Sequence, residues 1–440
     1  MNSSALHVNF AHTLGKIKPM HGVGQPPFYG MNYSMMHYLT EAHIPYTRLH
    51  DVGGSYGGSV YVDVPNIFRD FDADETDPAS YDFAFTDALM AEIVKAGCEP
   101  YYRLGVTIEN YPYIRAYRIS PPKDFAKWAR ICEHIVRHYI DGWADGFHYD
   151  VTYWEIWNEP DNLGIDPLKN QMWRGTKEQY FDLYRTAATH LKACFGDRIK
   201  VGGFASCGFY GVVHNPEEQQ TDPNRPYYIR FFDDFLDMIR TTNTPIDFFS
   251  HHSYNPPELT RQMNRYAVQK LADAGLGDVE IHLNEWHPYP SIENRGSARN
   301  CAAAAAMMLI MQDERMDVMC FYDARIGQSC YGGLFNPMTW QPLCTYYAFR
   351  AFGALYALGT QAEVTVSGDG LYAVAATDGR TNGVMIANTG AARVLSTDLP
   401  AGMHVYAIDP DHRMIEVGLS TSELEIGENQ VLYVCSEAVN

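Results

Sequence analysis

Two glutamates at the ends of apolar runs carry the chemistry that this sequence could perform. Glu159 lies in residues 153–160 (Tyr-Trp-Glu-Ile-Trp-Asn-Glu-Pro), and Glu285 lies in residues 281–288 (Ile-His-Leu-Asn-Glu-Trp-His-Pro). Glycoside hydrolysis uses such a pair, because one acid protonates the leaving oxygen while a second carboxylate acts at the anomeric carbon. Retention of configuration requires the two carboxyl groups to be about 5–5.5 Å apart. We predict Glu159 as the general acid/base and Glu285 as the nucleophile.

The pair is more informative than either glutamate alone, because an isolated Asn-Glu-Pro could equally be an ordinary loop. Glu155 has the same side-chain parity as Glu159 but lies deeper in its run, so we expect a buried, hydrogen-bonded structural role for it. Ser206 and Cys207 also follow an apolar run, but they lack the context of a nucleophile elbow and are interpreted as non-catalytic.

Alternating apolar and amphipathic segments over the first 350 residues predict the scaffold that would position these glutamates. This alternation is typical of parallel strands joined by helices, and a (β/α)8 barrel takes roughly 250 residues. Active sites of such barrels lie where the strands end, and on this count Glu159 and Glu285 end the fourth and seventh strands. The eight strands are expected near residues 16–23, 46–51, 99–103, 152–157, 200–204, 247–252, 280–284 and 318–322.

Two segments illustrate the expected helices. From Ser120, a predicted N-cap, apolar residues recur at three- and four-residue steps up to Tyr139. A second helix is expected from Phe83 to Ala96, where Gly97 would end it in a left-handed conformation. The run Ala302–Ala306 is interpreted as a close-packed helix in the outer ring of the barrel.

Beyond about residue 358 the pattern changes to short runs of alternating polar and apolar residues, separated by Gly, Asp and Asn. This pattern is typical of an antiparallel β-sandwich. The fold class is therefore α/β, a (β/α)8 TIM barrel with a C-terminal antiparallel β-sandwich. We place the catalytic barrel at residues 12–357 and the accessory sandwich at residues 358–440, with residues 1–11 adding a strand to the sandwich.

Charge and composition narrow the class of ligand. The net charge of -20 disfavours nucleic acids and anionic membranes, and it is compatible with a neutral sugar. No apolar run approaches ~20 residues and no secretory signal is seen, so we expect a cytoplasmic protein without a membrane span. No CxxC pair occurs among the nine cysteines, and His282 and His287 do not form a metal-ligand set, so we assign no metal and no cofactor. A homo-oligomer is left open.

The two glutamate motifs resemble those of glycoside hydrolase family 39, and the resemblance extends over essentially the whole chain. Arg48-Leu49-His50 resembles an Arg-x-His element of the family on strand two, and His252-Ser253-Tyr254 resembles its strand-six element. The resemblance implies that Tyr254 hydrogen-bonds the nucleophile and that Asn158 holds the sugar hydroxyl next to the cleaved bond. The substrate-binding set predicted in this way is His50, Asn158, His252, Tyr254, Trp286, Tyr322 and Asp323.

One region departs from the family pattern. The family's β-xylosidases carry acidic residues after strand eight that help to bind xylose, whereas residues 321–328 here read Phe-Tyr-Asp-Ala-Arg-Ile-Gly-Gln. Asp323 could match one acidic position, but the paired glutamates are missing. A salt bridge to Asp323 is the simplest interpretation of Arg325. Sugars other than xylose, arabinofuranosyl groups among them, therefore remain open.

The predicted function is retaining, exo-acting hydrolysis of glycosidic bonds in small plant-derived oligosaccharides with xylosyl or arabinosyl ends. Two other functions on the same fold stay open: a sugar-binding protein without hydrolytic activity, and a transglycosylase. A metal-dependent barrel hydrolase is a further alternative, and the absence of a His/Asp ligand cluster in the sequence argues against it.

Overall fold

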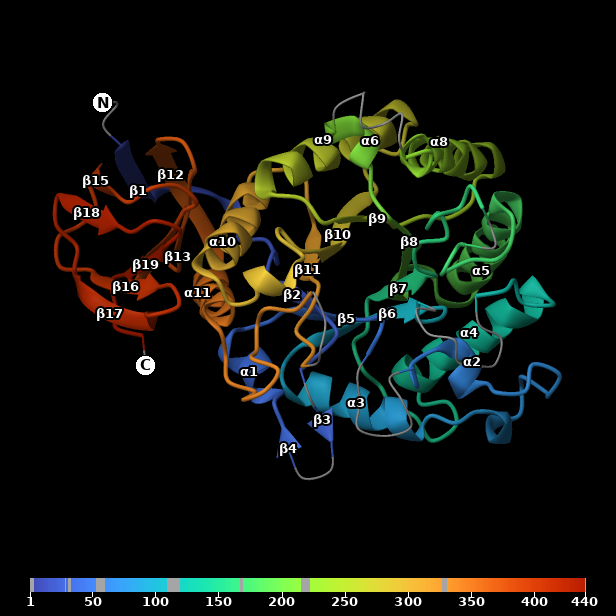
Figure 1. The fold of residues 1–440 in the computed structure, drawn as a ribbon. Coiled ribbons are helices and arrows are strands. Elements are labelled where there is room, and N and C mark those ends of the chain that lie inside the picture. The colour runs from blue at the N-terminus through green and yellow to red at the C-terminus, as the bar shows by residue number, and fades with distance from the viewer. Residues whose placement is uncertain are drawn as a thin grey trace.

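The computed structural model describes residues 4–27, 29–30, 33–52, 60–108, 119–166, 169–214, 222–326 and 331–439. Within them, eight parallel strands close into a barrel surrounded by helices, and a sheet packs against one side of that ring (Figure 1). The predicted barrel is confirmed. Its strands, in spatial order, are β10 (Glu280–Trp286), β11 (Val318–Phe321), β2 (Gly22–Gly24), β5 (Tyr46–Leu49), β6 (Glu99–Leu104), β7 (Tyr153–Ile156), β8 (Lys200–Ser206) and β9 (Phe248–Ser253).

The first barrel strand differs from its prediction. Only Gly22–Gly24 forms the barrel strand, whereas Lys16 ends the long N-terminal strand β1 (Ser4–Lys16), which belongs to the other sheet. The apolar residues Ile17 and Met20, which suggested a continuous strand, are buried in the connection between the two. Burial alone does not distinguish a strand from a packed connection.

Helices of three or more turns form most of the outer ring. Helix α4 (Phe125–Ile140) buries the predicted stripe, but Asp124 rather than Ser120 is its N-cap, because the Asp124 carboxylate accepts a hydrogen bond from the Lys127 amide. Helix α3 (Ala84–Lys95) ends next to Gly97, whose φ of 78° fits the predicted left-handed stop. The remaining helices are α1 (His37–Glu41), α2 (Val64–Ile67), α5 (Lys177–Phe195), α6 (Tyr210–Val213), α8 (Asn224–Thr242), α9 (Pro257–Asp273), α10 (Ala298–Gln312) and α11 (Cys344–Leu358). Short 3-10 turns span Pro78–Ser80, Gly196–Arg198 and Ile292–Asn294, and β3 (Tyr29–Gly30) pairs with β4 (Tyr33–Ser34).

The C-terminal sheet has nine strands in the order β17-β16-β19-β14-β13-β12-β1-β15-β18. Strand β1 lies between β12, to which it is antiparallel, and β15, to which it is parallel, so the sheet is mixed. One face of the sheet gathers a core of its own that includes Leu6, Leu395 and Val434, which gives the domain its sandwich-like character. The strands that follow the barrel are β12 (Thr360–Ser367), β13 (Leu371–Thr377), β14 (Asn382–Asn388), β15 (Arg393–Thr397), β16 (His404–Ile408), β17 (Arg413–Leu419), β18 (Glu423–Ile426) and β19 (Val431–Cys435).

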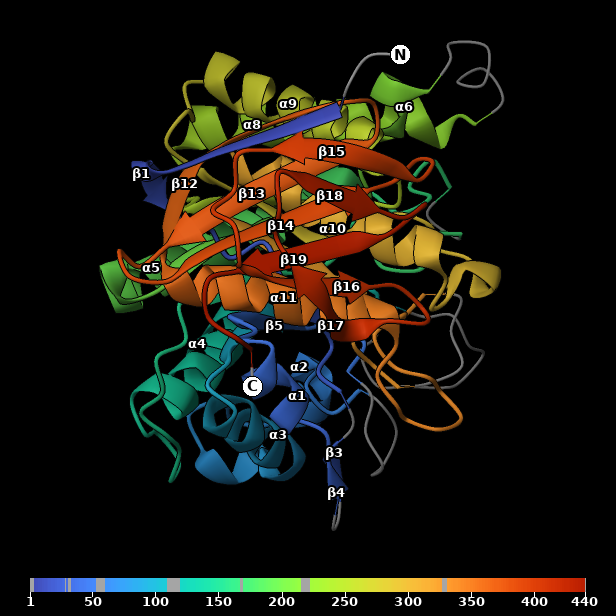
Figure 2. The ribbon, with the colours of Figure 1, turned by 90° about the vertical axis from the view of Figure 1, so that its left-hand side faces the viewer.

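The other face of this sheet covers α10 and α11, which separate it from the barrel (Figure 2). Every residue of α10 from Asn300 to Gln312 is buried, because the helix contacts the barrel on one side and β13 and β14 on the other. A helix that is apolar on all sides is expected in such a position. The small side chains of Ala302–Ala306 allow the close approach. No helix among the described residues is both long and apolar enough to cross a membrane.

Candidate active site

Glu159 and Glu285 meet at the mouth of the barrel. Both line a cavity of about 320 Å³ at the carboxyl ends of the strands, and both are more than nine-tenths buried. One carboxylate oxygen of each glutamate and one ring nitrogen of His252 all lie within 4.8 Å of one another. The cavity is lined by His50, Asp51, Ile108, Glu159, Asn162, Gln171, Cys207, Tyr210, Tyr228, Tyr254, Glu285, Tyr322 and Tyr331.

Glu285 is the last residue but one of β10, and it accepts hydrogen bonds from two strong donors. The guanidinium of Arg48 lies 3.1 Å from Oε2, and the hydroxyl of Tyr254 donates to Oε1, as the family resemblance implied. Burial raises the pKa of Glu285 to about 7, and the negative charge of Glu159 acts in the same direction, whereas His252 and Arg48 oppose the rise.

Glu159 follows β7 in a turn with unusual backbone angles. Trp157 and Glu159 have φ values of 72° and 42°, in the left-handed region that L-residues seldom adopt, and the Glu159 amide donates to the carbonyl of Ala205 at 3.0 Å. The carboxylate accepts from Asn162 at 2.8 Å and contacts Nδ1 of His252 at 2.7 Å. Burial favours a raised pKa for Glu159, but the hydrogen bond and positive charge of His252, together with further donors, lower it.

His252 therefore contacts both glutamates. Its Nε2 lies 3.6 Å from Oε2 of Glu285, and the two carboxylates raise the pKa of the imidazole in spite of its complete burial. The three side chains could in geometric terms hold a cation. The raised pKa of His252 opposes metal binding, however, because a metal requires the neutral ring. A second group within the described ranges, Glu133, His190 and Cys194, lies between α4 and α5.

Four of the other predicted residues lie in or directly beneath the cavity. His50, Tyr254 and Tyr322 line it. Asn158 is buried beside Glu159, and its side-chain oxygen accepts from the guanidinium of Arg48. The sequence motifs on strands two, four, six and eight thus converge on one place.

Trp286 and Asp323 do not lie where the prediction needs them. Trp286 follows Glu285 on the same strand, so its side chain points to the opposite face, where it packs 5.0 Å from the ring of Phe321 in the layer between barrel and α11. Asp323 is buried outside the cavity and pairs with Arg325 at 3.0 Å, as the simpler interpretation of Arg325 predicted. Neither residue is among the described residues that line the cavity, and their place in the substrate-binding set stays a prediction. Residues 327 and 328 of this segment lie outside the described residues.

A buried network beneath the cavity was only partly predicted. Glu155 is fully buried and accepts hydrogen bonds from Arg48 at 2.8 Å, from the Ser250 hydroxyl at 2.6 Å and from the amide of Asn284, which confirms its structural role. Arg48 joins this network to Glu285, a role that the sequence analysis missed. The signal was present, because an arginine inside a predicted barrel strand must find buried carboxylates as partners.

Asp51 and Asp161 were also missed. Asp51 lines the cavity, and Asp161 lies behind Glu159, where it accepts from the Ser206 hydroxyl at 2.8 Å. Burial raises the pKa of Asp161 to about 7, and the charge of Glu159 adds to this rise. Both aspartates follow strand ends in loops, where no periodicity indicates the direction of a side chain.

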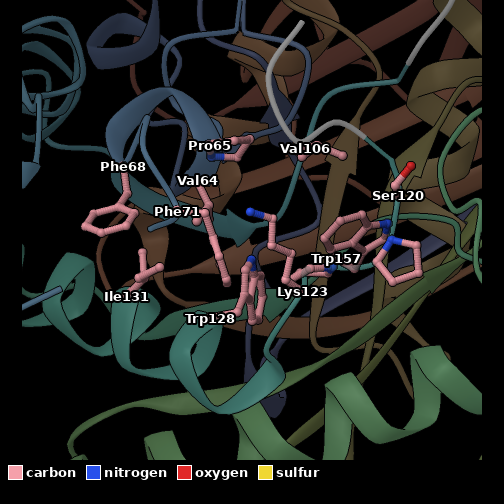
Figure 3. Close-up of a pocket in the computed structure, with 12 residues that line it drawn as sticks. Val64, Pro65, Phe68, Phe71, Val106, Ser120, Lys123, Trp128, Ile131 and Trp157 are labelled. Atoms are coloured by element: carbon pink, nitrogen blue, oxygen red, sulfur yellow. The ribbon is translucent and has the colours of Figure 1, made fainter. Parts of the chain in front are cut away.

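A second cavity, of about 110 Å³, lies beside Trp157 and outside the carboxylate site (Figure 3). Trp128, Val64 and Phe68 are among the apolar side chains that line it. No carboxylate or histidine occurs among the described residues that line it.

Comparison with known proteins agrees with this geometry. The family model described as glycosyl hydrolases family 39 matches residues 57–325. A β-xylosidase of Caldicellulosiruptor saccharolyticus is 26% identical over 223 residues, and one of Geobacillus stearothermophilus is 25% identical over 224 residues. These alignments cover 48% and 49% of the chain but only 39% of each relative, so the chain matches about two fifths of their length.

Solved structures share the whole architecture. A glucosidase from Croceicoccus marinus superposes with a TM-score of 0.77 at 21% identity, and each chain is covered to 99%. A family 39 enzyme from Xanthomonas axonopodis pv. citri gives a TM-score of 0.70 at 16% identity, with 99% of this chain and 97% of that chain covered. At these identities the likeness is one of fold.

Proposed function

The chain belongs to glycosyl hydrolase family 39, and on that premise we propose that it is a retaining, exo-acting glycosidase. The observation that carries the proposal is the convergence of two buried carboxylates, with one oxygen of each within 4.8 Å of the other. Inverting enzymes separate their carboxyl groups by about 6.5–9.5 Å to admit a water molecule. Two carboxylate oxygens this close to each other fit the spacing of about 5–5.5 Å between carboxyl groups in retaining enzymes, which supports direct attack by Glu285.

In the first step, Glu285 attacks the anomeric carbon and the bond from that carbon to the leaving oxygen breaks. Glu159 transfers its proton to that oxygen, so a covalent glycosyl-enzyme and a free alcohol result. In the second step, Glu159, now a carboxylate, takes a proton from water. The water oxygen bonds to the anomeric carbon, and Glu285 leaves as a carboxylate. Arg48 and Tyr254 position Glu285 and stabilise its charge in both steps.

This sequence of steps needs the shared proton on Glu159. Burial raises the pKa of Glu285, and the contact with His252 lowers that of Glu159, so both shifts oppose this arrangement. Transfer of a proton from Glu285 to Glu159 gives the reactive form. His252 contacts both carboxylates and is placed to carry the transfer, while Arg48 and Tyr254 favour the ionised form of Glu285.

The proposed substrates are small plant-derived oligosaccharides with xylosyl or arabinosyl ends. The two β-xylosidases among the relatives support a pentose, and a cavity bounded by loops of several strands suits one terminal sugar better than the middle of a polymer. The lack of paired glutamates after β11 keeps the arabinosyl alternative open.

The test is hydrolysis of a panel of p-nitrophenyl glycosides by the wild type and by Glu159→Ala and Glu285→Ala. We expect one pentoside to be cleaved and each variant to lose at least ~10²-fold in kcat. Glu280→Gln is the matched control, because Glu280 lies on the same strand as Glu285 but at its opposite end, where it pairs with Lys200. Proton NMR of the first product should show retained configuration.

Other outcomes would change the assignment. An inverted product would refute double displacement. Sugar binding without turnover of any glycoside would favour a non-hydrolytic binding protein, and acceptor sugars that compete with water would favour a transglycosylase.

A further inference from the structure

The two residues that follow β5, His50 and Asp51, form a polar wall of the cavity. Neither takes part in the proposed reaction steps. Both side chains line the cavity, with 3% and 6% of their surfaces exposed. Nε2 of His50 lies 3.4 Å from Oδ1 of Asp51, so the two groups form one unit. The cavity thus has a third carboxylate besides Glu159 and Glu285.

Asp51 is held in place from neighbouring strand ends. The Tyr322 hydroxyl donates to Oδ2 at 2.8 Å, the Ile108 amide donates to Oδ1 at 3.3 Å, and Arg325 reaches the backbone carbonyl of Asp51 at 3.4 Å. Each carboxylate oxygen can accept two hydrogen bonds, so these donors leave acceptor capacity for a ligand. A carboxylate fixed in this way can receive hydroxyl groups without being reorganised.

His50 has an unused nitrogen. Nδ1 of His50 is buried and has no hydrogen-bond partner among the described residues. Burial, followed by the charges of Arg103 and Arg48, holds the pKa of His50 well below its ordinary value, so the ring is neutral. A buried polar atom without a partner is uncommon in proteins, and the neutral ring adds no positive charge to this wall of the cavity.

The backbone conformation at Asp51 is unusual for a residue that carries a side chain. Its φ is 54°, in the left-handed region where glycine is the least strained residue. Strained backbone of this kind tends to persist at functional sites, where the side chain is needed in spite of the strain. Asp51 is one of several such residues at the mouth, together with Trp157, Glu159 and Ala205.

We propose that the Asp51 carboxylate, together with the His50 imidazole, binds neighbouring hydroxyl groups of the sugar in the cavity and determines which sugar the enzyme accepts. This inference rests on the proposed glycosidase function. No lysine or arginine occurs among the cavity-lining residues that the structure describes, so the recognised face is a neutral diol. Asp51 thereby supplies acidic recognition from strand two, whereas the segment after β11 lacks the paired glutamates.

The experiment combines two variants of Asp51 with substrates that lack single hydroxyl groups. Asp51→Gly removes the carboxylate and relieves the backbone, but it also leaves the Tyr322 hydroxyl and the Ile108 amide without their acceptor, so its thermal unfolding is measured beside its activity. Asp51→Asn keeps the shape and removes the charge. The kcat/KM of each protein is measured on the p-nitrophenyl glycoside that the wild type cleaves fastest, and on the 2-, 3- and 4-deoxy analogues of that glycoside.

We expect both variants to lose about 10- to 100-fold on the parent substrate. On one deoxy analogue they should lose no more than about threefold, because the wild type also lacks that hydrogen bond there. The same fold loss on the parent and on all three analogues would overturn the inference, since it would mean that Asp51 only supports the fold through Tyr322.

Failure of the glycosidase proposal is distinguishable. If the wild type cleaves no glycoside, the thermal unfolding of wild type and Asp51→Asn is compared in D-xylose, L-arabinose and D-glucose. Stabilisation of the wild type alone supports the role of Asp51 in sugar binding. Equal stabilisation of both proteins, or of neither, overturns it.

Discussion

The mouth of the barrel and the seam between α10 and the C-terminal sheet are both removed from solvent, but they contain different side chains. At the mouth, Arg48, Glu155 and Glu285 are buried together as charged groups. The seam is built from Ala, Met, Leu and Ile of α10 packed on β13 and β14. Burial of apolar surface stabilises a fold, whereas buried ion pairs contribute little net stability even when every partner is present.

Backbone conformation shows the same contrast. Asp51, Trp157, Glu159 and Ala205 have positive φ values near the mouth, whereas α10 is a regular helix capped by Ser297. We infer that apolar packing at the seam stabilises the fold. This stability compensates for the buried charges and the unusual backbone angles that position the side chains at the mouth. If this contrast is correct, substitutions at the mouth should change activity as well as stability, whereas substitutions at the seam should change stability alone.

Replacement of Arg48 by Met should have the greatest effect, because it leaves Glu155 and Glu285 without their cation. Removal of one partner from a buried ion pair destabilises a protein by about 3–5 kcal/mol. Loss of the guanidinium also raises the pKa of Glu285, so the acid limb of the profile of kcat/KM against pH moves to higher pH. Urea unfolding and a pH–rate profile measure the two effects.

Arg48→Lys is the matched control for charge. It keeps the charge but not the planar fork that reaches Glu155, Glu285 and Asn158 together, so an intermediate loss is expected. If Arg48→Met were as stable and active as the wild type, the mouth would not depend on its buried charges.

Leu309→Ala tests the seam. Leu309 is 1% exposed on α10, and its truncation should lower the free energy of unfolding by about 2–5 kcal/mol through the cavity that it leaves. We expect kcat/KM to stay within about twofold of the wild type at temperatures where the variant is folded. Leu14→Ala on β1, where Leu14 is 54% exposed, should change stability by less than about 0.5 kcal/mol. A large loss of kcat/KM in Leu309→Ala would mean that the seam positions the site.

The same division explains what the sequence could predict. The barrel, the strand ends and Glu159 with Glu285 were predictable because buried parallel strands read as apolar runs, and their ends must meet at one mouth. The period of two along a strand places Trp286 opposite Glu285, so its place in the substrate-binding set follows from the family resemblance and not from the strand geometry.

Other features depend on contacts that no local pattern shows. The mixed pairing of β1 between β12 and β15 joins residues about 344–391 positions apart in the chain. Asp51 and Asp161 lie in loops, where side-chain direction follows from individual φ and ψ angles rather than from a period. Their contacts with Tyr322 and Ser206 exist only once the barrel has closed.

Asp161→Asn should stabilise the protein. Such a gain would show that a buried carboxylate at the mouth lowers the stability of the fold. The pKa of Asp161 is about 7 in the folded protein, compared with 3.8 for an unperturbed aspartate, as in the unfolded chain. Between these values the folded state binds more protons, so its stability falls as the pH rises from about 4 to about 7. Asparagine has no such charge. We expect a gain on the order of 1–2 kcal/mol at pH 8, less than the full shift because the new amide group also needs partners.

The gain from Asp161→Asn should be smaller at pH 5 than at pH 8, and urea unfolding at the two pH values measures the difference. Asp182→Asn on α5 is the matched control, because it makes the same change at a carboxylate that is exposed to solvent. An equal gain at both pH values would attribute the effect to packing rather than to the buried charge.

The smallest effect is expected at His21, an ionisable group in the apolar region beneath the barrel. His21 is fully buried against Phe352 and Tyr356 of α11, and burial lowers its pKa to about 3. Between pH 3 and 6.5 the unfolded chain binds more protons at this residue, so stability is lost as the pH falls below 6.5. His21→Gln removes this proton uptake, and the glutamine amide can still donate to the carbonyl of His43.

We expect the wild type to lose about 1 kcal/mol more than His21→Gln when the pH falls from 7 to 5.5. Chemical unfolding at both pH values measures the difference, with the exposed His37→Gln as the control that should follow the wild type. His50, His251 and His287, whose pKa values are also lowered by burial, remain in the variant, so the acid sensitivity should be reduced but not abolished. An unchanged pH dependence in His21→Gln would assign the acid sensitivity to these three histidines at the carboxyl end of the barrel and none of it to His21.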